Sequence, residues 1–218
     1  MPDAVKPRSY RSPVRASRAA ATRKAVLDAA QELFLDNGYP ATTAREIAAA
    51  ARVSVDTVYA SVGRKPEVML ALLERAISGG EHAVAPDDRA YVQAVAAAPS
   101  ARQKLAIYAA ALRELIPRLA PLVAALKQAG AADPECAAVW AQISGRRAAN
   151  MRRFAAELRS TGELRADLSD DEVADIVWST NAPEYYLLLV ERGWTPEAYE
   201  RLLVDVWTRT LLEPSSWS

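Results

Sequence analysis

Two short helical segments separated by only a few residues constrain this chain more than any other feature of its sequence. The run Thr43-Ala-Arg-Glu46 has the pattern of a capping box, with a hydroxyl at the N-cap and a carboxylate three residues later. It predicts a short helix that ends near Ala51. Ser54 is a suitable N-cap for a second short helix over residues 55–61. Because only Arg52-Val53 lies between them, the pattern predicts two helices joined by a tight turn.

A longer helix precedes this pair. One of its faces follows the i, i+4, i+7, i+8 spacing of a helix and is formed by Val26, Ala30, Leu33, Phe34 and Asn37. Gly38 follows directly and is a good C-cap. A long helix followed by two short ones is a helix-turn-helix arrangement, here over residues 19–61. The core of such a unit leaves the outer face of the third helix free, and a helix about 10–12 Å across fits the major groove of B-DNA.

The remainder of the chain also has a helical pattern. The 218 residues include only 8 glycines and many alanines, which favours helices over sheets, and no strand alternation is present. Pro117 and Pro121 are expected to interrupt the helical pattern, and Pro183 is expected to kink one long helix. The fold class predicted is all-α, with nine or ten helices in total, and after the first three they lie over residues 66–78, 87–97, 101–116, a short stretch ending at 129, 134–160, 170–192 and 196–212.

Composition excludes several classes of function. Cys136 and His82 are the only cysteine and the only histidine, so neither an internal disulfide framework nor a Cys/His zinc site can form. A Ser–His–Asp triad would depend on His82 alone. We therefore expect no metal, no cofactor and no enzymatic activity. The sequence has no apolar run of about 18 residues and no secretory signal, so we expect no membrane span and a cytoplasmic location.

A net charge of zero conceals an uneven distribution. The first 24 residues contain seven cations and a single acid, Asp3, a net charge of +6, which leaves −6 on the rest of the chain. A basic segment on a mildly acidic body indicates a polyanion as partner, although a solvated tail with no partner gives the same pattern. Residues 1–18 contain three prolines and lack helical periodicity, and we interpret them as a flexible basic arm.

The run from Ala41 to Tyr59, followed by Lys65-Pro-Glu-Val68, resembles the DNA-binding domain of the TetR family of bacterial repressors. The resemblance covers about residues 22–75. Arg52 stands where the family usually has Gly, which predicts a strained or altered turn. Val62 stands where a Phe is usual, and it remains suited to the core. The resemblance implies a helix-turn-helix DNA-binding domain at residues 19–63 and a larger helical ligand-binding and dimerisation domain at residues 64–218.

The resemblance also implies roles in DNA binding for individual positions. Arg45 would contact a base, while Tyr59 and Lys65 would contact phosphates. Val55 is suited to a thymine methyl, and Asp56 either accepts from cytosine or only favours the helix dipole. Thr43 would combine helix capping with phosphate binding. The complete set of expected DNA contacts is Thr43, Arg45, Ser54, Val55, Asp56, Thr57, Tyr59 and Lys65.

The larger domain is expected to bind a small-molecule effector and to form a homodimer. The last two predicted helices, at about residues 169–192 and 195–212, have an apolar surface wider than one core contact needs, so we expect a second subunit to cover part of it. Aromatic residues commonly line ligand pockets, although each of them is equally suited to a plain core. The candidates for the effector pocket are Tyr91, Tyr108, Trp140, Trp178 and Tyr185.

Taken together, these features predict a ligand-responsive transcriptional regulator, most simply a repressor. It would bind a palindromic DNA operator as a homodimer and be released by a small-molecule effector. Two alternatives belong to other classes: a helical enzyme that relies on carboxylate chemistry, and an interaction module whose head binds protein in place of DNA. Salt dependence separates DNA binding from these, since contacts with phosphates weaken as salt rises.

Overall fold

The structure is a computed structural model that describes residues 13–78 and 85–214. Over these residues every regular element is a helix, which confirms the all-α fold predicted from the sequence. In chain order the elements are α1 (Pro13–Asp36), α2 (Ala44–Ala50), α3 (Val55–Ser61), α4 (Lys65–Ser78), the 3₁₀ turn η1 (Pro86–Asp88), α5 (Ala90–Ala97), α6 (Ala101–Gly130), α7 (Pro134–Arg159), α8 (Asp170–Thr180), α9 (Pro183–Val190) and α10 (Pro196–Leu211).

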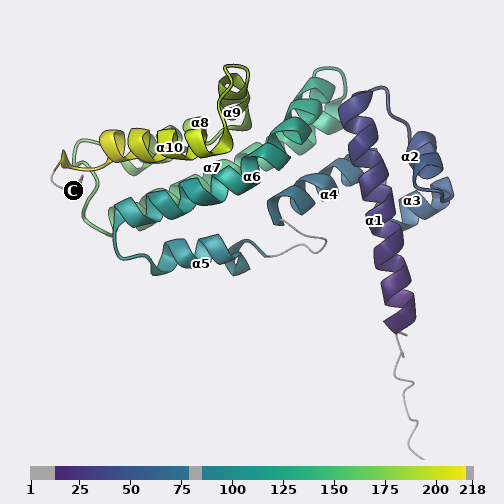
Figure 1. Cartoon of the computed structure of the whole chain (residues 1–218), viewed down its shortest axis with the longest axis horizontal. Coiled ribbons are helices and arrows are strands. Elements are labelled where there is room, and N and C mark those ends of the chain that lie inside the picture. The colour runs from purple at the N-terminus through teal and green to yellow at the C-terminus, as the bar shows by residue number, and fades with distance from the viewer. Residues whose placement is uncertain (1–12, 79–84, 215–218) are drawn as a thin grey trace, which may run out of the picture.

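The helices pack around two hydrophobic cores. The first, which we call the head core, joins α1–α4 to the C-terminal end of α6 and the first turn of α7. The second, the body core, is formed by α5, most of α6, the C-terminal half of α7, and α8–α10. In Figure 1, α1–α3 stand at one end of the molecule and α5 and α10 at the other, with α6 running between them. Since α6 belongs to both cores, it connects the two parts mechanically.

The head core contains most of the face that the helical periodicity of α1 predicts, but Asn37, at the end of that face, is exposed. Val26 and Phe34 of α1 are buried, and so are Ile47 of α2 and Val58 of α3. Leu33 and Val62 are only half-buried and pack against the edge of this core. Burial of a Val, Ile or Phe side chain stabilises a fold by about 1.5–3 kcal/mol, so a few such residues suffice to fix α2 and α3 on α1.

The predicted interruption of helix at Pro117 and Pro121 is wrong, because α6 continues through both residues as one helix of 30 residues. Each proline removes one amide donor from the helix, which is unfavourable in isolation. However, α6 packs against α1, α4, α5, α7, α9 and α10, and its buried residues recur along its whole length. Tertiary packing of this extent outweighs local propensity, and single-sequence rules do not include it.

The single kinked helix predicted over residues 170–192 is two helices, α8 and α9, separated by Asn181 and Ala182. Asn181 is 2% exposed, and its side-chain amide donates to the Tyr108 hydroxyl at 2.8 Å. Its side-chain oxygen accepts from the Arg147 guanidinium at 2.9 Å. Pro183 occupies the first turn of α9, where its missing amide is tolerated. The break is thus a buried, hydrogen-bonded junction.

Candidate nucleic-acid interface

The capping box predicted at the start of α2 is present. The Glu46 amide donates to Thr43 Oγ1 at 3.2 Å, while the Thr43 amide and hydroxyl donate to Glu46 Oε2 at 2.7 and 2.8 Å. These bonds from Thr43 hold the pKa of the Glu46 carboxyl below its ordinary value. The box fixes where α2 begins and occupies both donor groups of Thr43, so a phosphate at this position has to compete with the Glu46 carboxylate.

The turn between α2 and α3 contains a left-handed residue that is not glycine. Arg52 has φ +55°, a region that costs a residue with a Cβ atom about 1–2 kcal/mol. The turn is closed by the Val53 amide, which donates to the Ala48 carbonyl at 3.0 Å. The strain that the sequence predicts at Arg52 is therefore present, and the position of α3 relative to α2 depends on it.

Helix α3 presents its outer face to solvent, as the helix-turn-helix pattern predicts. Val58 points into the head core, whereas Asp56 and Ala60 are exposed and the Tyr59 side chain is 49% exposed. Ser54 accepts from the Thr57 amide at 3.1 Å and caps the helix. The face carrying Asp56 and Tyr59 is therefore available to a partner.

Two features fix the C-terminal end of α3. At its C-terminal end, Arg23 of α1 donates to the Ser61 carbonyl at 2.8 Å. Gly63 follows with φ +128°, and a Cβ atom there would lie 2.8 Å from Glu67 Cβ, so only glycine fits this turn. Together these contacts fix the direction in which the chain leaves α3 and enters α4.

Lys65 begins α4 and is tied to the loop that precedes α2. Its ammonium donates to the Thr42 carbonyl at 2.8 Å and to the Pro40 carbonyl at 3.4 Å, and it lies 4.2 Å from the centroid of the Tyr39 ring. Burial lowers the pKa of Lys65 despite the acidic groups Asp133 and Glu46 nearby, which raise it. Lys65 thus helps to position α2 relative to α4, a role that its place in the sequence does not reveal.

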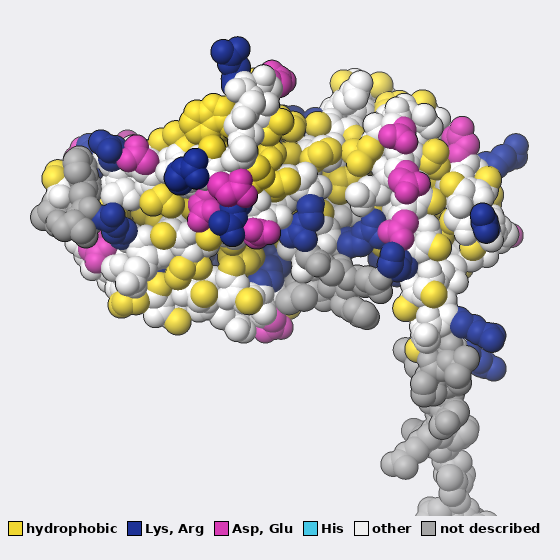
Figure 2. Space-filling view, in the orientation of Figure 1, with side chains coloured by type: hydrophobic (Ala, Val, Ile, Leu, Met, Phe, Trp, Pro, Cys, Tyr) yellow, Lys and Arg dark blue, Asp and Glu magenta, His cyan; other side chains and the backbone are white. Residues whose placement is uncertain are grey.

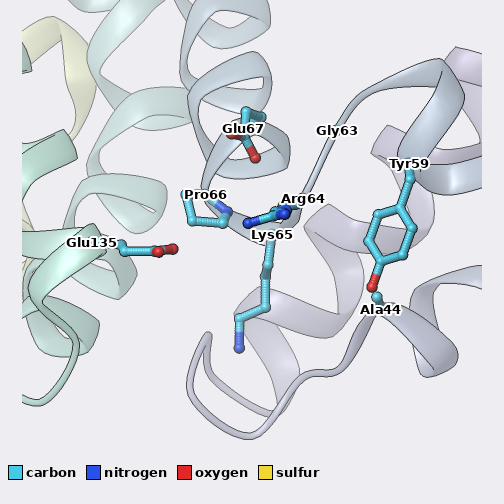
Figure 3. Close-up of a pocket in the computed structure, with 8 residues that line it drawn as sticks. All are labelled: Ala44, Tyr59, Gly63, Arg64, Lys65, Pro66, Glu67 and Glu135. Atoms are coloured by element: carbon cyan, nitrogen blue, oxygen red, sulfur yellow. The ribbon is translucent and has the colours of Figure 1, made fainter.

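An open hollow of about 940 Å³ lies between α2, α3, the start of α4 and the first turn of α7. In Figure 3 the side chains of Tyr59 and Lys65 extend in the same direction, one from α3 and one from α4. Arg64, which is not among the expected DNA contacts, also borders this space. The sequence feature that points to Arg64 is the basic pair Arg64-Lys65, which directly follows Gly63. The residues around the hollow are Ala44, Tyr59, Gly63, Arg64, Lys65, Pro66, Glu67 and Glu135.

Helix α1 extends past α2 and α3 and carries positive charge there (Figures 1 and 2). It begins at Pro13, before the start near Ala19 that the periodicity predicts. All charged residues from Pro13 to Lys24 are basic, and Arg15 and Arg18 are exposed. The rest of the arm predicted at residues 1–18 lies outside the described residues. The helical start of α1 thus places part of the basic segment beside α3.

The expected DNA contacts belong to α2, α3, the N-caps of these two helices and the first residue of α4. Arg45 is exposed, and its side chain makes no hydrogen bond or ion pair with the residues that the structure describes. Val55 and Thr57 are half-buried at the start of α3. A second, shallower hollow of about 660 Å³ runs between α1 and α3, past Asp56 and Thr57.

Three of the five expected effector contacts, Tyr108, Trp178 and Tyr185, pack against the body core, and Tyr91 stacks on Tyr108. Tyr108 is central there: its ring lies 6.2 Å from that of Tyr91 and 5.8 Å from that of Trp207, and burial raises its pKa. Tyr185 approaches Tyr199, with ring centroids 6.4 Å apart. Trp178 contacts a cation, because the Arg147 guanidinium lies 4.6 Å from the centroid of the Trp178 ring.

Trp140 is separate from the other four. It packs against the head core, with the Lys127 ammonium 5.0 Å from its ring centroid.

Within residues 13–78 and 85–214, no cluster of His, Cys, Asp and Glu has the form of a metal site, and no helix there is long and apolar enough to span a bilayer.

Comparisons with known proteins agree with this architecture. SmeT in its triclosan complex, the repressor of the SmeDEF multidrug efflux pump of Stenotrophomonas maltophilia, has 20% sequence identity and a TM-score of 0.69, covering 91% of this chain and 95% of SmeT. NalD, the secondary repressor of the MexAB-OprM pump of Pseudomonas aeruginosa, has 19% identity and a TM-score of 0.71, covering 91% and 99%. A transcriptional regulator from Saccharomonospora viridis in complex with choline has 18% identity and a TM-score of 0.66, covering 88% and 97%.

At these identities the structural likeness shows the shared fold. No curated protein matches the chain. The family model for bacterial regulatory proteins of the tetR family matches residues 26–72, from the middle of α1 to the middle of α4. These residues include α2, α3 and much of the head core. The head thus matches the tetR family of bacterial regulatory proteins over residues 26–72, and the chain as a whole shares the fold of the solved regulators.

Proposed function

We propose that the chain is a ligand-responsive transcriptional repressor that binds a palindromic DNA operator as a homodimer. The observation that supports this most directly is the exposed face of α3, which carries Asp56 and Tyr59 and lies beside the basic N-terminal half of α1. An α-helix of this size fits the major groove, and neighbouring cations neutralise phosphates. A regulator of transcription acts where the chromosome lies, so we expect the cytoplasm.

In this proposal α3 reads bases while the surrounding residues bind the backbone. Val55, Asp56 and Thr57 form the leading turn of α3 and face the base edges, and Arg45 of α2 reaches an adjacent base. Tyr59 is placed for phosphate contact, with Thr43, Ser54 and Lys65 at the ends of the two helices. The Lys65 ammonium already binds two carbonyls, so it reaches a phosphate with its remaining donor or by exchanging one of them.

The effector is proposed to bind in the body, among Tyr91, Tyr108, Trp178 and Tyr185. Structurally similar regulators have been solved with triclosan and with choline, which supports a small molecule as the ligand class. Helix α6 takes part in both cores and contacts α4, so a rearrangement of the body core can move the head. A coupling of about 1–3 kcal/mol would change operator affinity about 5- to 150-fold, and by linkage the operator would weaken effector binding equally.

The homodimer is proposed to form through α8–α10. A single head contacts too few bases for high specificity, whereas two heads about 34–36 Å apart reach successive major grooves. Enzymatic activity is no part of this proposal.

Selection of bound duplexes from a random DNA pool tests the proposal. We expect a palindrome with half-sites about one helical turn apart. Arg45→Ala is expected to lose most of the affinity for the selected duplex, whereas Arg118→Ala, which removes an exposed cation of α6, should keep it. Recovery of no common sequence, or equal binding by parent and Arg45→Ala, would contradict the proposal.

A further inference from the structure

Helix α10 has one exposed face on which charges alternate in sign. Its opposite face, which includes Tyr199, Leu203, Trp207 and Leu211, is buried in the body core. The exposed residues recur every fourth position, so they form a single row along the helix with a rise of about 6 Å between neighbours. This row, which we call the charged row, consists of Glu197, Arg201, Asp205 and Arg209.

Ion pairs within α10 engage only two of the four residues of the charged row. Arg209 Nε lies 2.6 Å from Asp205 Oδ1, an ordinary i,i+4 ion pair. Glu197 and Arg201 have the same spacing, yet within the described residues neither takes part in an ion pair. Hydrogen bonds with its own backbone amide and with Thr195, and attraction to Arg113 and Arg201, hold the pKa of the Glu197 carboxyl below its ordinary value, but no ion pair within the described residues fixes Arg201.

The order of signs in the charged row is complementary to its own reverse. Read from Glu197 to Arg209 the row is negative, positive, negative, positive, and read backwards each sign is inverted. An antiparallel second copy related by a two-fold axis would therefore place Arg201 opposite Asp205 of the partner subunit. It would also place Glu197 opposite Arg209 of the partner subunit. A parallel copy in register would align like charges, which is unfavourable.

Apolar residues beside the charged row and near the start of α10 are only partly covered within the subunit. Leu202 is half-buried, is absent from the set of side chains that pack against the body core, and sits one residue from the proposed two-fold axis. Near the start of α10, Leu188 is 61% exposed, Val190 41% and Trp194 38%. Figure 2 shows hydrophobic side chains gathered at this end of α10, around α9. Burial of such a surface provides association energy that ion pairs at the rim do not supply.

We propose that the charged row of α10 packs antiparallel against the same row of a second copy of this chain, and that its alternating signs set the register and select identical partners. This inference rests on the homodimer of the proposed function and goes beyond it. It specifies two central pairs, each between Arg201 and the partner's Asp205. Leu202 meets the partner's Leu202 next to the axis. The four residues of the charged row then determine the register of the two helices and favour pairing with an identical chain.

Two single substitutions in the full-length chain test the inference. Arg201→Asp places an acid opposite the partner's Asp205, and Asp205→Arg places a cation opposite the partner's Arg201. Each variant alone should dimerise about 10- to 100-fold more weakly than the parent chain, because both central pairs become repulsive. When the two variants are mixed in equal amounts, opposite charges meet again, so a heterodimer should form with nearly parental affinity. Native mass spectrometry and sedimentation equilibrium measure both effects.

The controls distinguish a loss of the correct register from misfolding of a variant and from a general loss of dimerisation. Arg118→Asp makes the same charge change on α6 and should dimerise like the parent. Glu197→Arg and Arg209→Glu form an independent outer pair, which replaces the central pair if thermal unfolding shows that a central variant is misfolded. Folded single variants that dimerise like the parent, or a mixture that stays monomeric, would overturn the charged-row register while the proposed homodimer stands. A parent chain that is monomeric throughout would instead overturn the homodimer itself.

Discussion

Arg23 donates from its guanidinium to the Ser61 carbonyl at 2.8 Å, and so ties the middle of α1 to the C-terminal end of α3. The two residues are 38 positions apart in the sequence. This bond satisfies a carbonyl that the end of a helix leaves without a partner, and places positive charge where the helix dipole is negative. The orientation of the proposed DNA-reading helix therefore depends on a basic residue of α1.

Arg23→Ala should loosen α3 and weaken operator binding. Loss of a part-buried hydrogen bond from a charged donor costs about 1 kcal/mol or somewhat more. We expect a lower free energy of unfolding in urea and a several-fold higher dissociation constant for the selected duplex. Arg18→Ala, which removes an exposed cation of the same helix, should affect stability less. Equal losses for the two variants would mean that charge alone matters at this place.

Arg52→Gly should stabilise the chain. The left-handed backbone at Arg52 favours glycine, and relief of its strain exceeds the entropic cost of glycine in the unfolded state. We expect a gain of about 0.5–1 kcal/mol in the free energy of unfolding. Ala51→Gly is the matched control, because Ala51 has φ −75° and gains nothing from glycine. A loss of stability in Arg52→Gly would show that the Arg52 side chain contributes more than its backbone costs.

The pH dependence of stability should include a contribution from Asp28. Burial raises the pKa of this carboxyl, but hydrogen bonds from Lys24 and Arg75 outweigh it and hold the pKa below its ordinary value. The stabilisation is therefore complete above that ordinary value, about 3.9, and is lost as the pH falls through the lowered pKa. Because the Asp28 side chain is 44% exposed, we expect only about 0.5–1 kcal/mol.

Asp28→Asn provides the comparison for this effect. At pH 7 the parent chain should be more stable than the variant, and the difference should shrink as the solution approaches pH 3. Urea unfolding at a series of pH values measures it. A difference that stays constant with pH would exclude ionisation of Asp28 as its source.

Lys65→Ala should change both DNA binding and stability. A phosphate contact by Lys65 predicts that the slope of log K against log salt becomes shallower by about one unit, equally for all sequences. Loss of its bonds to the Thr42 and Pro40 carbonyls predicts a lower free energy of unfolding as well. Titrations at several salt concentrations, with Arg118→Ala as control, separate the two roles. An unchanged slope with reduced stability would leave Lys65 only a structural role.

The parts of the fold that the sequence predicted correctly are those governed by local chemistry. The capping box of Thr43 and Glu46 forms, because it depends on two residues that are three positions apart. The strained turn at Arg52 was likewise visible from one residue in a position that favours glycine. The buried positions Val26, Ala30 and Phe34 of α1 followed from periodicity.

The parts that could not be predicted depend on contacts between distant residues. Continuity of α6 through Pro117 depends on packing from several helices, and the break at Asn181 depends on Tyr108 and Arg147. In the same way, no local sequence pattern indicates that Arg23 donates to the Ser61 carbonyl. None indicates that Lys65 donates to the Thr42 and Pro40 carbonyls. Trp140 was grouped with the effector contacts only because it is aromatic, and its packing against the head core comes from the tertiary fold.

Repeating the DNA selection with Asp56→Asn tests most directly whether α3 reads sequence. Asp56 is exposed on the first turn of α3, so the substitution removes a charge from the reading face without disturbing the head core. The account predicts that the preferred base changes at the same position in both half-sites, and that affinity for the parent's operator falls. Recovery of the parent's operator with unchanged affinity, together with the same result for Val55→Ala and Thr57→Ala, would contradict the account.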